Sequence, residues 1–172
     1  MSRTTLTTLL LCTFIHLPVL LSQGPPAEES FEQFLTRWAV AQTRFINGDP
    51  TLWKQLASHR DDVTILGGFG GEGEKGWPAV GARYEWAASQ YRPGAATVNV
   101  DYHVVAVTGD LAYTVGIERQ SNVRVGAQVE AVHRNLRVTQ IFRREGGQWK
   151  LIHRHGDQMV EKQENLPATL RK

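Results

Sequence analysis

The densest cluster of chemically capable residues in the chain is HRHGD, at positions 153–157. On a β-strand, side chains two and four positions apart project from one face, so His153, His155 and Asp157 would project together. Two imidazoles and a carboxylate on one face could bind a metal, relay a proton, or hydrogen-bond inside a half-buried groove.

The direction of this row follows from the residues before it. His153 and His155 continue, at the same two-residue spacing, the row begun by Trp149 and Leu151. We therefore expect the polar row to share the face of these large apolar side chains, and Arg154 to point the other way.

Histidine titrates near neutral pH, which favours acid–base work or ligand contact. In that interpretation His153 and His155 handle the proton and Asp157 orients them. The alternative is a structural pair of hydrogen-bonded histidines. The letters H-x-H-x-D also begin the metallo-β-lactamase motif, but Gln158 replaces the histidine that would follow. Catalytic zinc normally needs three protein ligands, so we expect no metal and no other cofactor.

A second candidate for proton transfer is Asp62, which just precedes a short strand. If it faces a cavity, burial would raise its pKa and it could act as a base. The alternative is a solvated turn formed with Asp61.

Several aromatic residues and two side chains on long strands could line a pocket for a flat apolar ligand. The candidate substrate-binding residues are Trp38, Tyr84, Trp86, Tyr91, Tyr113 and Arg137. The aromatic residues could equally be core. An inward Arg137 would need a carboxylate partner, and the alternative is a solvent-facing side chain.

The elements that must position these residues fall into two groups. Apolar spacing predicts a helix from Phe31 to Phe45, a short helix after Asp49-Pro50, a strand at 63–66 and a helix at 78–91. Four long strands joined by glycine turns follow. These strands span 97–109, 111–125, 129–145 and 148–160. Helices segregated from an antiparallel meander predict an α+β fold, and Gly116 is a candidate bulge site.

The stretch GGFGGEGEKGW at 67–77 contains G-x-G-x-x-G at Gly71, Gly73 and Gly76. A dinucleotide site would need parallel strands and crossover helices, and after residue 92 no segment is long enough for one. We therefore interpret the glycines as a flexible connection between the short strand and the helix that follows.

The ends of the chain have a different character. Residues 1–24 are typical of a signal peptide, which implies export to the periplasm or outside the cell; the alternative is a mistaken start on a cytoplasmic protein. Residues 25–30 form a linker, 31–160 the domain and 161–172 a flexible tail. We expect no stable membrane span in the mature chain. A net charge of +2 with interspersed acidic residues argues against a nucleic-acid-binding face.

The stretch TQIFRREGGQWKLIHRHGD resembles the last two strands of SnoaL-like domains in the nuclear transport factor 2 superfamily. DDVTILGGFGG and GDLAYTVGIE are also similar to bacterial members. The resemblance implies a cone-shaped cystatin-like roll, with three N-terminal helices packed on a strongly bent antiparallel sheet. It also implies a pocket at the open end and homodimers formed through the outer sheet face. In such a cone the glycine stretch would lie near the pocket mouth, where Phe69 or Trp77 could cover a ligand.

The combined expectation is a pocket protein for a small, apolar organic molecule. If it is an enzyme, the resemblance implies metal-free acid–base chemistry of the isomerase, dehydratase or cyclase class. The alternative is a non-catalytic ligand-binding or dimerisation module, since this fold supports many activities.

Overall fold

The computed structural model describes residues 28–160. Helix α1 spans Phe31–Phe45, as predicted. It begins with a capping box, in which the Ser30 hydroxyl accepts a hydrogen bond from the Gln33 amide (3.2 Å) and the Gln33 side chain accepts one from the Ser30 amide (2.9 Å). The helix is followed by Gly48, whose φ of 91° suits glycine.

The remaining short elements follow in chain order. Helix α2 spans Thr51–Leu56, strand β1 Thr64–Leu66, strand β2 Glu74–Lys75 and helix α3 Trp77–Ser89. The two helices and β1 confirm the sequence prediction to within two residues. Strand β2 was not predicted, because two residues within a glycine-rich stretch carry no periodic signal.

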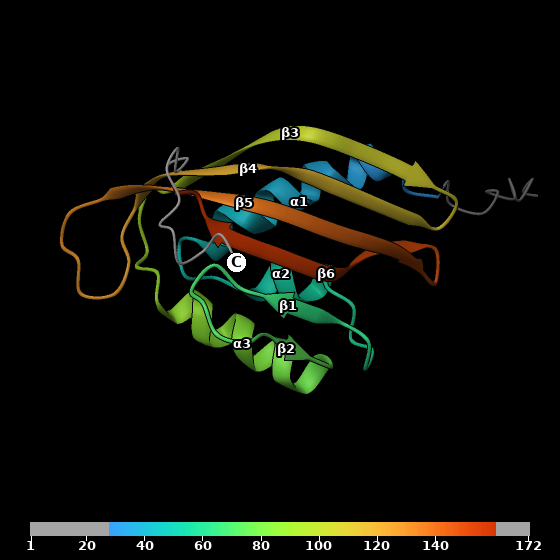
Figure 1. The fold of residues 1–172 in the computed structure, drawn as a ribbon, viewed down its shortest axis with the longest axis horizontal. Coiled ribbons are helices and arrows are strands. Elements are labelled where there is room, and N and C mark those ends of the chain that lie inside the picture. Colours follow the sequence, from blue (N-terminus) through green and yellow to red (C-terminus); the bar gives the residue numbers. More distant parts are fainter. Residues whose placement is uncertain (1–27, 161–172) are drawn as a thin grey trace, which may run out of the picture.

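Four long strands complete the chain: β3 Thr97–Thr108, β4 Leu111–Val123, β5 Val132–Glu145 and β6 Gln148–Gln158. The sheet order is β2-β1-β6-β5-β4-β3, which runs from bottom to top in Figure 1. The antiparallel meander is confirmed. Strand β1, however, pairs in parallel with β6, a join between segments far apart in sequence that periodicity could not predict.

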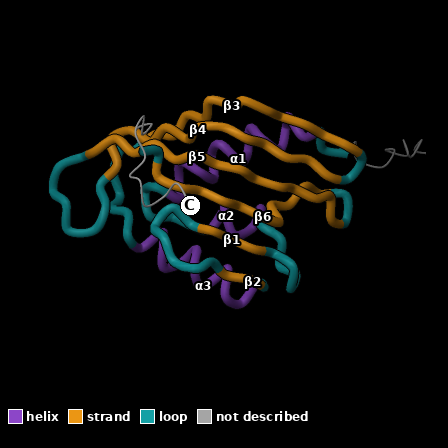
Figure 2. Tube along the Cα trace, viewed as in Figure 1, coloured by secondary structure: helices purple, strands orange, loops and turns teal. Residues whose placement is uncertain are grey.

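The helices cover one face of this curved, open sheet, as Figures 1 and 2 show with α1 behind the long strands and α3 beside β1 and β2. The core is aromatic. The rings of Phe34 and Trp38 on α1 meet Phe142 on β5 edge-on, at centroid distances of 5.3 and 5.9 Å. The α+β fold class is therefore confirmed. Within residues 28–160, no helix is long and apolar enough to cross a membrane.

The sheet carries a bulge opposite Gly116. Tyr102 pairs with Gly116 and Val104 with Val115, so His103 is an extra residue on β3. A Cβ atom on Gly116 would lie 2.5 Å from the carbonyl oxygen of Asp101. The irregularity predicted at Gly116 is therefore present, and the glycine permits the close approach of the bulged strand.

A second bulge, on β6, overturns one prediction. Phe142 pairs with Leu151 and Ile141 pairs with His153, so Ile152 is extra. An extra residue reverses the alternation of side chains along a strand. The polar row therefore leaves the face of Trp149 and Leu151, and the prediction that it continues that face was wrong.

Candidate ligand pocket

A small cavity lies between the helices and the concave face of the sheet. Its walls include Phe45, Phe69 and Leu136, and its polar lining comes from Tyr84 on α3 with Glu118, Gln120 and Arg154 on the sheet. The cavity leaves about 40 Å³ of space for the centres of water molecules. An apolar cavity of about 150 Å³ holds one benzene ring, so this space suits a few waters or a molecule of two or three non-hydrogen atoms.

A buried ion pair forms the polar floor. Arg154 Nη2 donates to Glu118 Oε2 at 2.9 Å, and the two side chains are only 6% and 2% exposed. Gln42 donates to the same carboxylate at 3.1 Å, and Gln120 donates to Oε1 at 2.6 Å. Three donors therefore compensate the removal of this carboxylate from water.

Arg154 is also held from its other side. The Gln140 amide, turned so that its oxygen faces donors, accepts from Arg154 Nη1 at 3.0 Å and from Trp38 Nε1 at 3.2 Å. The guanidinium carbon lies 5.3 Å from the centre of the Trp53 ring. These contacts fix the cation in a single place beneath the cavity.

The Tyr84 side chain is 1% exposed, and burial raises the pKa of its hydroxyl to about 12. The nearby Trp53 indole opposes part of this rise, although the two side chains form no hydrogen bond. Three buried polar atoms around the cavity have no partner among the described residues. They are the Tyr84 hydroxyl, Trp53 Nε1 and Gln120 Oε1.

The glycine stretch closes one side of the cavity. Phe69 packs against Tyr91 at a ring-centroid distance of 5.4 Å. Arg134 donates to the Tyr91 hydroxyl at 2.7 Å and to the Gly68 carbonyl at 3.2 Å, and so ties the loop to β5. Phe69 therefore lines the cavity, and its role as a lid stays a prediction. Trp77 instead stacks on His59 at 3.7 Å and is not part of the cavity wall.

Comparison with known protein families identifies the family of this chain. The family model of the SnoaL-like domain matches residues 31–161. The chain belongs to the SnoaL-like domain family. No curated protein matches it.

Solved structures share the fold at low sequence identity. A nuclear transport factor 2-like protein from Salmonella enterica superposes with a TM-score of 0.62 at 18% identity, covering 76% of this chain and 89% of its own. A proposed dehydratase of the same superfamily from Streptomyces avermitilis gives 0.61 at 21%, covering 76% and 94%. A protein of unknown function from Pseudomonas putida gives 0.59 at 25%, covering 78% and 88%.

The predicted pocket residues of this SnoaL-like domain divide into two groups. Tyr84 and Tyr91 line the cavity. Trp38 is fully buried in the core, whereas Trp86 is 44% exposed under the Arg83 guanidinium. The cavity therefore brings together two of the four aromatic residues expected on the helices.

The polar row lies on the outer face of the sheet. His155 Nε2 is 3.0 Å from Asp157 Oδ2, and Arg137 Nη2 is 3.8 Å from the same oxygen. Tyr113 is 46% exposed on this outer face. Because Arg154 is the inward neighbour, these residues lie across the sheet from the cavity, and their predicted roles in catalysis and substrate contact stay predictions.

His153 lies on β6, where it pairs with Thr64 of the neighbouring strand β1. Its Nδ1 is 2.8 Å from the Thr64 hydroxyl. Partial burial and the neighbouring His155 lower the pKa of His153 below its ordinary value of 6.5. This environment favours the neutral imidazole.

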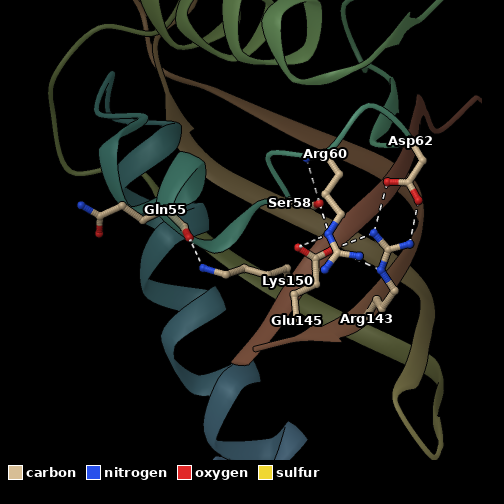
Figure 3. A network of polar contacts seen from close by, with 7 residues as sticks. All are labelled: Gln55, Ser58, Arg60, Asp62, Arg143, Glu145 and Lys150. Carbon is tan, nitrogen blue, oxygen red and sulfur yellow. Dashed lines mark hydrogen bonds and ion pairs between the residues drawn. The ribbon is translucent and has the colours of Figure 1, made fainter. Parts of the chain in front are cut away.

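Asp62 takes part in a surface network instead of facing a cavity. Figure 3 shows its carboxylate in a two-pronged contact with Arg143, at 2.7 and 3.1 Å. Arg143 also contacts Glu145, which Arg60 approaches at 3.4 Å. The Arg143 hydrogen bonds lower the pKa of Asp62. A raised pKa was expected only if Asp62 faced a cavity, and its role as a base stays a prediction. Among residues 28–160, no group of three or more His, Cys, Asp or Glu side chains is placed to hold a metal ion.

Sequence reasoning did not propose the ion pair. The sequence of β4 does carry a signal for Glu118. Thr114, Glu118 and Gln120 share one face of this strand at even spacing, and the apolar Val115 and Ile117 share the other. A polar row on the inner face of a strand indicates a polar pocket floor. The pairing with Arg154 could not be found without the β6 bulge.

Proposed function

We propose that this SnoaL-like domain binds a small organic molecule in the cavity beneath α3. The observation that carries the proposal is a cavity with aromatic and aliphatic walls that encloses a buried Arg154–Glu118 ion pair. Ligand sites in proteins combine mostly apolar walls with a few placed polar groups. A buried ion pair contributes little net stability compared with apolar residues of the same size, which favours a role in recognition.

If the domain is an enzyme, we propose that the predicted acid–base chemistry takes place in this same cavity. The solved relative described as a proposed dehydratase is compatible with it at the level of fold. In this cavity the proton-handling groups would be Tyr84 or Glu118 in place of the predicted histidines. Glu118 already accepts three hydrogen bonds from protein groups, so the geometry favours binding over catalysis.

The homodimer implied by the family resemblance and the exported location stay predictions. The outer sheet face offers apolar side chains for the dimer, among them Leu111 and Tyr113, both about half exposed. The predicted signal peptide, linker start and tail lie outside the described residues.

Native mass spectrometry of the purified full-length chain tests the proposal. We expect a bound small molecule that is lost on denaturation. Ala87 lines the cavity, whereas Ala82 is exposed on the same helix. Ala87→Leu should fill the space and remove the adduct, and Ala82→Leu should keep it. An adduct retained equally by both variants would place the ligand elsewhere and overturn the proposal.

A further inference from the structure

An open groove lies between helix α1 and strand β3, outside the cavity beneath α3. Leu35 and Ala39 on α1 form one wall, and Val98, Val100 and Tyr102 on β3 form the other. This α1–β3 groove encloses about 330 Å³. Since a cavity of about 150 Å³ holds one benzene ring, the groove has room for two large apolar side chains.

We propose that residues 161–172 of this chain bind in the α1–β3 groove as a further strand of the sheet. Strand β3 lies at the top edge of the sheet in Figure 1, and β4 is its only neighbour among the described residues. The inner-face side chains of Tyr102, Val105 and Val107 are 38%, 47% and 51% exposed, so α1 covers this edge only in part. An edge of this kind can pair with an added strand. The proposal does not rest on the proposed function.

The first argument is reach. The Met159 amide donates to the Asn135 carbonyl at 2.9 Å, Asn135 pairs with Arg119, and Arg119 pairs with Asn99 on β3. The chain therefore leaves β6 level with the start of the groove. A strand added outside β3 would lie about 19 Å from β6, which about six residues of extended chain span. The segment 161–172 covers that distance and leaves about six residues to lie along β3.

The second argument is the pattern of the segment. Leu166, Ala168 and Leu170 recur at two-residue spacing, which places apolar side chains on one face of a strand. That face would meet the apolar walls of the groove. Pro167 is compatible with a strand at the edge of a sheet, where no ladder hydrogen bond is needed from its nitrogen.

The third argument is charge. Helix α1 runs antiparallel to β3, since Asn47 just after α1 donates to the Ala96 carbonyl just before β3, at 2.9 Å. Glu32, in the first turn of α1, therefore lies at the far end of the groove from the point where the segment would enter. It is the one charged side chain among the described residues that line the groove. The basic residues Arg171 and Lys172 would end beside this carboxylate.

A spin label on residue 169 locates the segment in the full-length chain. Thr169 faces away from the groove in the proposed arrangement, so Thr169→Cys carries the label, and Cys12→Ser removes the other thiol. A nitroxide broadens the NMR signals of nearby methyl groups. We expect loss of the signals of Leu35 and Val100, which line the groove. The signal of Leu66 on β1, on the opposite side of β6, should stay sharp.

Two further substitutions in the labelled chain test whether the segment enters the groove. Leu170→Asp would place a carboxylate between apolar walls and should restore the signals of Leu35 and Val100. Gln163→Asp adds the same charge to the part of the segment that crosses the sheet, and should leave the broadening unchanged.

Three results would overturn the proposal. Broadening of Leu66 as strong as that of Leu35 would mean that the segment does not bind the edge of β3. Broadening of Leu35 that persists in Leu170→Asp would mean that the segment passes near the groove without entering it. If spin-labelled chains broaden the Leu35 signal of unlabelled, isotope-enriched chains mixed with them, the groove binds the segment of a second copy.

Discussion

The hydroxyl groups of Tyr84 and Tyr91 are both buried, but within residues 28–160 only that of Tyr91 has a hydrogen-bond partner. Tyr91 accepts a hydrogen bond from Arg134, whereas Tyr84 has no partner among the described residues. Tyr91→Phe should therefore lower the free energy of unfolding by about 1 kcal/mol. Tyr84→Phe should leave it unchanged or raise it, because a desolvated orphan group is removed.

Chemical denaturation of the two tyrosine variants and the wild type compares these effects directly. Since both changes delete one oxygen atom from a buried ring, the loss of volume is matched. A loss of stability in Tyr84→Phe as large as in Tyr91→Phe would mean that the Tyr84 hydroxyl stabilises the fold.

Substitution of Glu118 tests how the buried ion pair affects the free energy of unfolding. Glu118→Ala leaves the Arg154 cation buried without a counter-charge, which should cost about 3–5 kcal/mol of unfolding free energy. Asp157→Ala breaks the outer-face contacts with Arg137 and His155, whose side chains are about half exposed, and should cost less than about 1 kcal/mol. Urea titrations of both variants measure the difference. Equal losses would show that the inner pair is not desolvated as described.

At the scale of elements, the titrating residue His153 lies where strand β6 pairs in parallel with strand β1. The pKa of His153 is lowered in the folded protein, so the unfolded chain binds more protons below its ordinary value of 6.5. The free energy of unfolding should therefore fall as the pH drops through that value. Thr64→Val should keep the slope, because burial and His155 cause the shift and the Thr64 contact does not.

His153→Gln should flatten the pH dependence in this window, which is measured by urea unfolding from about pH 8 to about pH 5. The contributions of groups such as Asp62 lie at lower pH, since its pKa is lowered from 3.8. An unchanged slope in His153→Gln would assign the titration to another residue.

The elements themselves could be predicted because apolar periodicity, glycine turns and helix caps are local signals. The faces of β6 could not, because the bulge at Ile152 arises from pairing with β5 and leaves no local mark. That single residue decides whether Arg154 or His155 reaches the cavity. The candidate site is therefore an ion pair and not the predicted histidines. Its Glu118 lies on β4, which is separated from Arg154 on β6 by strand β5.

At the scale of the whole molecule, we expect the two faces of the sheet to have different functions, ligand binding on the inner face and dimer formation on the outer face. The inner face holds the cavity, and the outer face carries exposed apolar side chains on β3 and β4, including Leu111 and Tyr113. If the predicted homodimer uses this face, Tyr113→Lys should yield a monomer in sedimentation velocity while binding in the cavity persists. A wild-type monomer would contradict the predicted dimer without affecting the cavity.

The most direct test of the central claim locates the ligand by methyl NMR. Leu136 and Ile46 border the cavity, whereas Leu111 and Ile141 lie on the outer face. Titration with ethanol, which takes about the volume of three waters, should shift the Leu136 and Ile46 methyl signals to saturation and leave those of Leu111 and Ile141 in place. Saturable shifts confined to the outer-face methyls would contradict the account.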